Sequence, residues 1–166
     1  VHDSTQPVST DRLQWYINGV RVSEFAVGAD VFPALNSESY INNNQLHTIG
    51  KNNYVSANYL DGYLAETWLI DGLGLDPTAF GEFKNEVWIP KAYTGDTSGT
   101  NTCHLNYSDS GNIGADTSGN GNTWTPVNLA STDVVLDSPT NNFATWNPLY
   151  ESDADITYSQ GNLRAS

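Results

Sequence analysis

Oxygen-bearing side chains are closely spaced in the segment Asp116-Thr117-Ser118-Gly119-Asn120-Gly121-Asn122. Asp116, Ser118 and Asn120 occupy positions one, three and five of an EF-hand-like calcium loop, and Gly121 occupies position six. Position twelve, where such a loop needs a bidentate Glu, is Val127, and no flanking helices are predicted. A structural turn without a cofactor is therefore the favoured interpretation. The alternative is that Asp116, Ser118 and Asn120 are calcium ligands.

Glycoside hydrolysis would require two carboxylates that face one sugar. Glu66 lies in the apolar run 59–72, and Asp61 and Asp71 each lie five residues from it. An odd separation on a strand places side chains on opposite faces, so no carboxylate pair is predicted there. We expect Glu66 to have a structural role, and a hydrolase fragment is the least favoured alternative.

Nucleophilic catalysis is not predicted either. Cys103 and His104 are adjacent, and neighbours on a strand point to opposite faces, so they do not form a dyad. Cys103 is expected to be a small buried apolar residue. The three histidines lack metal-ligand spacing, and single hydrogen-bonding roles are predicted for them. The chain is therefore expected not to be an enzyme.

The five tryptophans are candidates for stacking on sugar rings. Trp15 and Trp68 stand at alternating positions of predicted strands, which favours a place in the core. Trp88, Trp124 and Trp146 are flanked by polar residues or proline and are the candidate carbohydrate-binding residues. Packing of a linker onto a β-sandwich is the alternative role for these three.

The elements that must position these residues are predicted to be strands. Hydrophobic residues make up 38% of the chain, which is enough for a packed core. Asn, Ser, Thr and Gly are abundant and compete with helical hydrogen bonding, which favours an all-β protein. The formal net charge of −13 repels phosphate backbones and anionic lipid, so neither nucleic acid nor a membrane surface is an expected partner. The longest apolar runs are too short for a spanning helix, so no membrane insertion is predicted.

Local patterns predict the individual elements. Asn18-Gly19 between two strand-like runs predicts a type I′ hairpin, with Leu13, Trp15 and Ile17 on one face before the turn and Val20, Val22 and Glu24 after it. Asp76 can cap, and Pro77 can open, a short helical turn. Strands or extended segments are predicted at 45–50, 59–72, 87–93, 102–107 and 156–166, and a connector at 137–149.

Together these pieces resemble an arrangement found in structural proteins of tailed bacteriophages, especially marine ones. In that arrangement a laminin-G-like (LamG) jelly roll of the concanavalin-A-like group is followed by a linker and a SPRY-like β-sandwich. The matching segments, in the expected order, are 13–19, 46–50, 61–72, 88–93, 116–124 and 139–149. The Glu-x-Asp-x-x-Glu pattern of the group's glucanases is absent.

The resemblance implies an antiparallel β-sandwich of which this chain holds a part. It places the C-terminal part of the LamG-like sandwich at 1–83 and a strand and loop extension with its linker at 84–149. The start of a further, SPRY-like β unit falls at 150–166. The jelly roll in such proteins begins before the point equivalent to Val1, so the chain is expected to begin inside a domain. Unpaired edge strands would then invite partners.

The function expected from this resemblance is that of a non-catalytic virion module at the virion surface, in a tail fibre, tail-associated or capsid-fibre protein. Its expected partners are other virion proteins or copies of itself in a homo-oligomer, and a host-surface glycan. The alternative is an extracellular carbohydrate-binding lectin module of a marine bacterium, secreted or at the cell surface.

Overall fold

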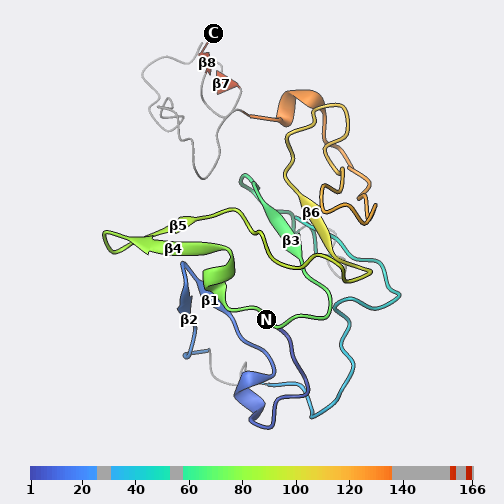
Figure 1. The fold of residues 1–166 in the computed structure, drawn as a ribbon. Coiled ribbons are helices and arrows are strands. Elements are labelled where there is room, and N and C mark those ends of the chain that lie inside the picture. The colour runs from blue at the N-terminus through green and yellow to red at the C-terminus, as the bar shows by residue number, and fades with distance from the viewer. Residues whose placement is uncertain (26–30, 53–57, 136–157, 160–163, 166) are drawn as a thin grey trace. The chain divides into compact units, whose positions relative to one another are not determined.

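The protein is mostly extended, with short strands and single turns of helix. The computed structural model describes residues 1–25, 31–52, 58–135, 158–159 and 164–165. Its elements, in chain order, are three 3₁₀ turns and eight strands: η1 (Ser9–Asp11), β1 (Tyr16–Ile17), β2 (Val20–Arg21), β3 (Thr67–Leu69), η2 (Pro77–Ala79), β4 (Gly81–Lys84), β5 (Val87–Pro90), β6 (Cys103–Leu105), η3 (Ser131–Asp133), β7 (Tyr158–Ser159) and β8 (Arg164–Ala165). The described fold is therefore all-β, as predicted (Figure 1).

The strands form four two-stranded antiparallel sheets, β1–β2, β3–β6, β4–β5 and β7–β8. In the described residues these sheets are small, and none joins another into a larger layer. The helical elements among those residues are 3₁₀ turns of three residues each, and none is long enough to cross a bilayer.

The chain divides into two compact units. Unit 1 contains residues 1–63 and 71–96, and unit 2 contains residues 64–70 and 97–166. Hairpins β1–β2 and β4–β5 belong to unit 1, and the β3–β6 pair belongs to unit 2. The two units are groups of residues that lie close together in space. The domain boundaries expected from the resemblance, after residues 83 and 149, stay a prediction.

The β1–β2 hairpin forms as the sequence predicts. Asn18 and Gly19 both have positive φ, +49° and +77°, which is the geometry of a type I′ turn. Tyr16 pairs with Arg21, and Ile17 pairs with Val20. Trp15, however, is 59% exposed, so its predicted place in the core is wrong. The hairpin has two-residue strands, and neither strand pairs with a further strand among the described residues.

The β4–β5 hairpin turns through Asn85 and Glu86, which have φ of +49° and +67°. The indole of Trp88 packs close to Gly19 and Gly81, where a Cβ atom would overlap it. The Phe83 ring meets the indole edge to face at 5.1 Å. Trp88 therefore joins the two hairpins of unit 1.

The helical turn after β3 also forms as predicted. Asp76 caps η2, because its carboxylate accepts the N–H of Thr78 at 2.9 Å, and Pro77 opens the turn. The hydrogen bonds from the hydroxyl and N–H of Thr78 hold the pKa of Asp76 below its ordinary value.

Two predicted strands are corrected. The segment 45–50 contains no strand; instead the Nε2 of His47 accepts the N–H of Asn42, and residues 46–48 have no regular secondary structure. The predicted strand at 59–72 is reduced to Thr67–Leu69, because only those residues pair with β6. The connector at 137–149 lies outside the described residues, and of the predicted strand at 156–166 only β7 and β8 are described.

The most deeply buried residues lie in unit 2. Thr102, Cys103, Leu105 and Ile113 are each at most 9% exposed. The prediction that Cys103 is a small buried residue is confirmed. Cys103 and Leu105 share one face of β6, and His104 lies on the other face and is half-buried.

Gly19→Ala tests the joint between the hairpins. A side chain at φ of +77° is strained, and its Cβ atom would push the Trp88 indole aside. We expect a loss of about 1–2 kcal/mol in the free energy of unfolding, measured by urea denaturation. The matched control Gly72→Ala has φ of +83° and nothing within 4 Å, so it isolates the backbone strain. An equal loss in both variants would contradict the packing role of Trp88.

Candidate functional site

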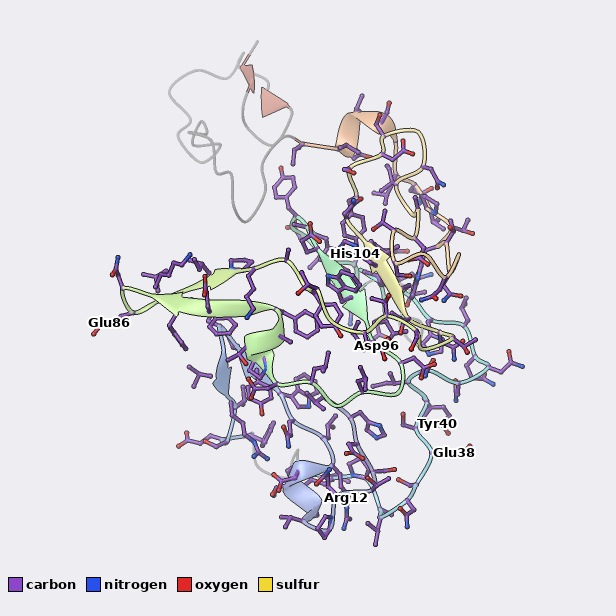
Figure 2. All side chains as sticks on the ribbon, in the orientation of Figure 1. Arg12, Glu38, Tyr40, Glu86, Asp96 and His104 are labelled. Atoms are coloured by element: carbon purple, nitrogen blue, oxygen red, sulfur yellow. The ribbon has the colours of Figure 1, made fainter. Side chains whose placement is uncertain are left out.

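The candidate site is the outer face of the β3–β6 pair in unit 2. The register pairs Thr67 with Leu105, Trp68 with His104, and Leu69 with Cys103. Because side chains alternate along a strand, Cys103 and Leu105 point to the core while Trp68 and His104 share the opposite face. His104 lies over this strand pair in Figure 2.

His104 is fixed on three sides. Its ring stacks on the Trp68 indole, with centroids 3.8 Å apart and planes within 5°. Its Nε2 bonds a carboxylate oxygen of Glu66, and its Nδ1 lies 2.7 Å from the hydroxyl of Thr117. The imidazole side chain is 15% exposed and the Glu66 side chain is 54% exposed.

The contacts form a carboxylate–imidazole–hydroxyl chain. In the neutral tautomer with hydrogen on Nε2, His104 donates to Glu66 and accepts the Thr117 O–H. In the imidazolium form Nδ1–H donates to Thr117, whose hydroxyl can donate to the His104 carbonyl at 3.2 Å. Both protonation states are therefore fully hydrogen-bonded.

The backbone amides beside the Thr117 hydroxyl are already hydrogen-bonded. The N–H of Thr117 donates to the His104 carbonyl, and the N–H of Ser118 donates to Asp116. Neither amide is available to stabilise an oxyanion beside the Thr117 hydroxyl. The geometry instead positions His104 and closes the 116–122 loop onto β6.

Asp116 organises that loop. One carboxylate oxygen accepts the N–H groups of His104 and Ser118, both at 2.9 Å. The other accepts the Ser118 hydroxyl at 2.9 Å and the N–H of Asn122 at 2.8 Å. Partial burial acts to raise the pKa of Asp116, but these four hydrogen bonds outweigh it and lower that pKa below its ordinary value.

The other calcium candidates also serve the loop itself. The carbonyl oxygen of fully buried Thr102 accepts the Ser118 hydroxyl at 3.2 Å and the side-chain N–H groups of Asn120 and Asn122 at 3.1 and 2.9 Å. Asn120 thus presents donors, whereas a calcium ion needs oxygen ligands. Within the described ranges no group of three His, Cys, Asp or Glu side chains is arranged to hold a metal ion. The hydrogen bonds favour the structural turn.

Tyr107 ties the end of β6 back to β3. Its hydroxyl donates to the Thr67 hydroxyl at 2.8 Å. Burial raises the pKa of Tyr107 above its ordinary value. This bond links β3 to the segment that follows β6.

The candidate carbohydrate-binding tryptophans have different environments. Trp88 is half-buried in unit 1 between Gly19 and Gly81. Trp124 is half-buried in unit 2, where its indole N–H donates to the Cys103 sulfur at 3.3 Å. Trp146 lies outside the described residues. Trp88 and Trp124 therefore each make packing contacts within their own unit.

Unit 1 contains a hollow of about 170 Å³. Its lining includes Asp3, Asp11 and Asp76. Each carboxylate is already bonded within the chain, to Thr5 and Gln6, to Arg21, and to Thr78, respectively. The hollow is smaller than typical ligand pockets of about 300–1,000 Å³.

The sequence analysis considered Glu66, Trp68 and His104 one by one, and it did not predict that their side chains are in contact. Glu66 and His104 are 38 residues apart, and the β3–β6 pairing brings them together. Thr117 was overlooked as a partner, because its neighbours Asp116 and Ser118 fitted a cation-loop pattern better.

Glu66→Gln tests the carboxylate at this site. The Glu66 side chain is 54% exposed, so we expect the free energy of unfolding to fall by less than about 1 kcal/mol. Guanidinium denaturation of both forms checks this expectation. His104→Ala, which also removes the stacking on Trp68, should cost more than Glu66→Gln. The reverse order would contradict the positioning role of the imidazole.

Comparison of the chain with family models, with curated proteins and with solved structures finds no match.

Proposed function

We propose that this chain is a non-catalytic structural module of a bacteriophage virion, in a tail fibre, a tail-associated protein or a capsid fibre. The observation that supports this most directly is the amount of apolar surface on its hairpins. Ile17, Val20, Phe83 and Val87 are each more than half exposed, and they lie on or beside two-stranded sheets. Apolar surface that extends over neighbouring strands is common at contacts with other chains.

The ordered resemblance to LamG-like and SPRY-like units adds the finer part of the proposal. The small sheets are parts of a jelly-roll sandwich that other virion proteins or copies of this chain complete. Free edges of two-stranded sheets offer unpaired backbone groups for that purpose. The hydrogen bonds around His104 and Asp116 agree with a non-catalytic role, because they use polar groups to hold loops.

Particle composition tests this function directly. An antibody raised against the purified chain should label virions by immuno-electron microscopy, and the chain should co-sediment with intact particles. A chain found only as a monomer secreted by a cell, separate from any particle, would refute the proposal.

A second candidate function is carbohydrate binding, either as host attachment by the virion module or as a bacterial lectin. The observation that favours it is the outer face of β3–β6, which combines an aromatic ring, Trp68, with the exposed carboxylate of Glu66. A glycan array probed with the purified chain tests it, with Glu66→Gln as the matched variant. Binding lost in the variant supports the role, and no binding to any sugar rejects it.

A further inference from the structure

The strand β6 has two edges, and β3 pairs with one of them. In an antiparallel pair, hydrogen-bonded and non-hydrogen-bonded residue pairs alternate along the strands. Trp68 and His104 form a non-hydrogen-bonded pair, because the backbone N–H and C=O of His104 are both bonded elsewhere. Cys103 and Leu105 therefore direct their backbone groups to β3, and His104 directs its own to the opposite side. We call that side the far edge of β6.

The loop 116–122 occupies the far edge of β6. The N–H of His104 donates to a carboxylate oxygen of Asp116 at 2.9 Å, and the His104 carbonyl accepts the N–H of Thr117 at 2.8 Å. A partner strand would offer the C=O and the N–H of one residue at this place. Here the carboxylate takes the place of the C=O, and the next residue supplies the N–H. Asp116 and Thr117 together therefore imitate one residue of a partner strand.

The same loop closes the next position along this edge. Backbone groups of alternate residues in an extended chain point to the same side, so Thr102 directs its carbonyl to the side of the His104 backbone groups. That carbonyl accepts the Ser118 hydroxyl at 3.2 Å and the side-chain N–H groups of Asn120 and Asn122 at 3.1 and 2.9 Å. The Thr102 carbonyl and both backbone groups of His104 are thus bonded by the loop.

The loop bonds this edge without being a strand itself. The N–H of Ser118 donates back to the Asp116 carboxylate at 2.9 Å, which turns the chain away from β6 directly after Thr117. Gly119 and Gly121 have φ of +97° and +78°, far from the φ of a strand. The hydrogen-bonded ladder therefore ends at Asp116 and Thr117.

We propose that the 116–122 loop protects the far edge of β6, so that an extended segment of another chain cannot add to the β3–β6 sheet there. An uncovered edge offers its N–H and C=O groups to any extended backbone, and covering the edge with a loop is one way in which proteins prevent such pairing. Because strand addition uses main-chain groups, an opened far edge would accept strands of many sequences. This protective role does not depend on where the chain functions.

Amide hydrogen exchange, followed by NMR, measures the protection of the edge. In the wild-type chain the amides of His104 and Thr117 should exchange as slowly as those of Cys103 and Leu105, which face β3. Asp116→Asn removes an acceptor at the far edge. We expect exchange at His104 and Thr117 to become about tenfold faster relative to Cys103 and Leu105. An equal change at all four amides would show that unit 2 opens as a whole, and would overturn the proposal.

Strand addition itself is measured as β-rich association of the full chain at neutral pH. Asp116→Asn chains should form oligomers that bind thioflavin T about tenfold faster than wild type, with the larger species seen by sedimentation velocity. Ile113→Ala is the stability control, because it truncates a residue that is 9% exposed and leaves the bonds at the far edge in place. Asp109→Asn is the charge control, in an exposed turn. Both controls should stay near the wild-type rate.

A milder variant, Asn122→Ala, keeps the test decisive if Asp116→Asn leaves too little folded chain. It removes one donor to the Thr102 carbonyl and retains the Asp116 carboxylate. We expect a smaller rise in the thioflavin T rate, about threefold, because the other bonds at the edge remain. Circular dichroism verifies that each variant is folded.

Two further results would overturn the protective role of the loop. One is a folded Asp116→Asn chain that exposes the His104 amide and still does not associate. The other is association of Ile113→Ala at the same rate as Asp116→Asn, since partial unfolding of unit 2 would then account for both. Neither result bears on whether the chain is found in virions, so failure of this role is distinguishable from failure of the proposed function.

Discussion

Asp116→Asn should destabilise unit 2 by about 2–3 kcal/mol. The carboxylate accepts four hydrogen bonds, three of them from the backbone N–H groups of His104, Ser118 and Asn122. An amide in its place turns an N–H₂ group toward donors, so at least one backbone N–H loses its acceptor. Each such loss costs about 1–3 kcal/mol. Urea denaturation followed by tryptophan fluorescence measures the change.

The matched control is Asp109→Asn. The Asp109 carboxylate accepts the N–H of Gly111 in an exposed turn, and we expect a cost below about 1 kcal/mol. Equal costs at Asp109 and Asp116 would show that the 116–122 loop does not depend on its carboxylate.

The contribution of Asp116 should also depend on pH. Its pKa in the folded chain is lowered, so the carboxylate adds stability that is complete above the ordinary value of about 3.9. That stability is lost as the pH falls from there through the lowered pKa. The difference in unfolding free energy between wild type and Asp116→Asn should therefore shrink in acid. A difference that is constant from pH 7 to pH 2.5 would contradict the hydrogen-bond assignment.

The second large effect is expected for Gly114→Ala, at about 3 kcal/mol. A Cβ atom at Gly114 would overlap the carbonyl oxygen of Trp124, which is backbone and cannot rotate away. The same two residues are hydrogen-bonded, because the N–H of Trp124 donates to the Gly114 carbonyl at 2.8 Å. The added methyl group must therefore separate two chain segments beside the buried residue Ile113.

Gly111→Ala is the control for Gly114. Its Cβ atom would meet a side-chain oxygen of Asp109 at 3.3 Å, and that side chain can move. We expect a change below about 1 kcal/mol in the same denaturation experiment. If Gly114→Ala were as well tolerated as Gly111→Ala, the close approach of the Trp124 backbone would be wrong.

Local turn chemistry made several elements predictable. Asn18-Gly19 determined the β1–β2 hairpin, because both residues adopt positive φ readily. Asp76 and Pro77 determined the 3₁₀ turn η2, since a capping carboxylate and a fixed φ suit its first turn. In each case the residues that decide the structure are neighbours in sequence.

The β4–β5 hairpin could not be found in this way. Glu86 adopts φ of +67° at its turn, a conformation that Glu seldom takes, so the sequence lacks the usual Asn-Gly signal. Its strands instead depend on tertiary contacts, above all the packing of the Trp88 indole against Gly19 of the other hairpin. Figure 2 shows Glu86 at the tip of this hairpin.

The prediction of a strand at 45–50 was wrong because a local signal was present without a partner strand. Its apolar pattern suits a strand, but a strand needs a partner, and none pairs with it among the described residues. The prediction of a core position for Trp15 was also wrong. Alternation along a strand predicts which side chains share a face, but it does not predict which face of the hairpin is buried.

The outer face of β3–β6 was partly predictable. Parity on a strand correctly separated Cys103 from His104. The register that brings His104 onto Trp68 and beside Glu66 connects residues far apart in sequence, and a single sequence contains no signal for that pairing. The Asp116 turn was predictable as a turn, whereas its anchor on the Thr102 carbonyl was not.

The buried thiol of Cys103 allows local unfolding of unit 2 to be measured by chemical labelling. Cys103 is 2% exposed and accepts the indole N–H of Trp124, so a water-borne thiol reagent reaches it when unit 2 opens. The labelling rate, divided by the rate for an unfolded chain, then gives the equilibrium constant for opening without any denaturant. Because the thiol lies on β6, the same measurement can follow how rigid this region becomes when the chain assembles.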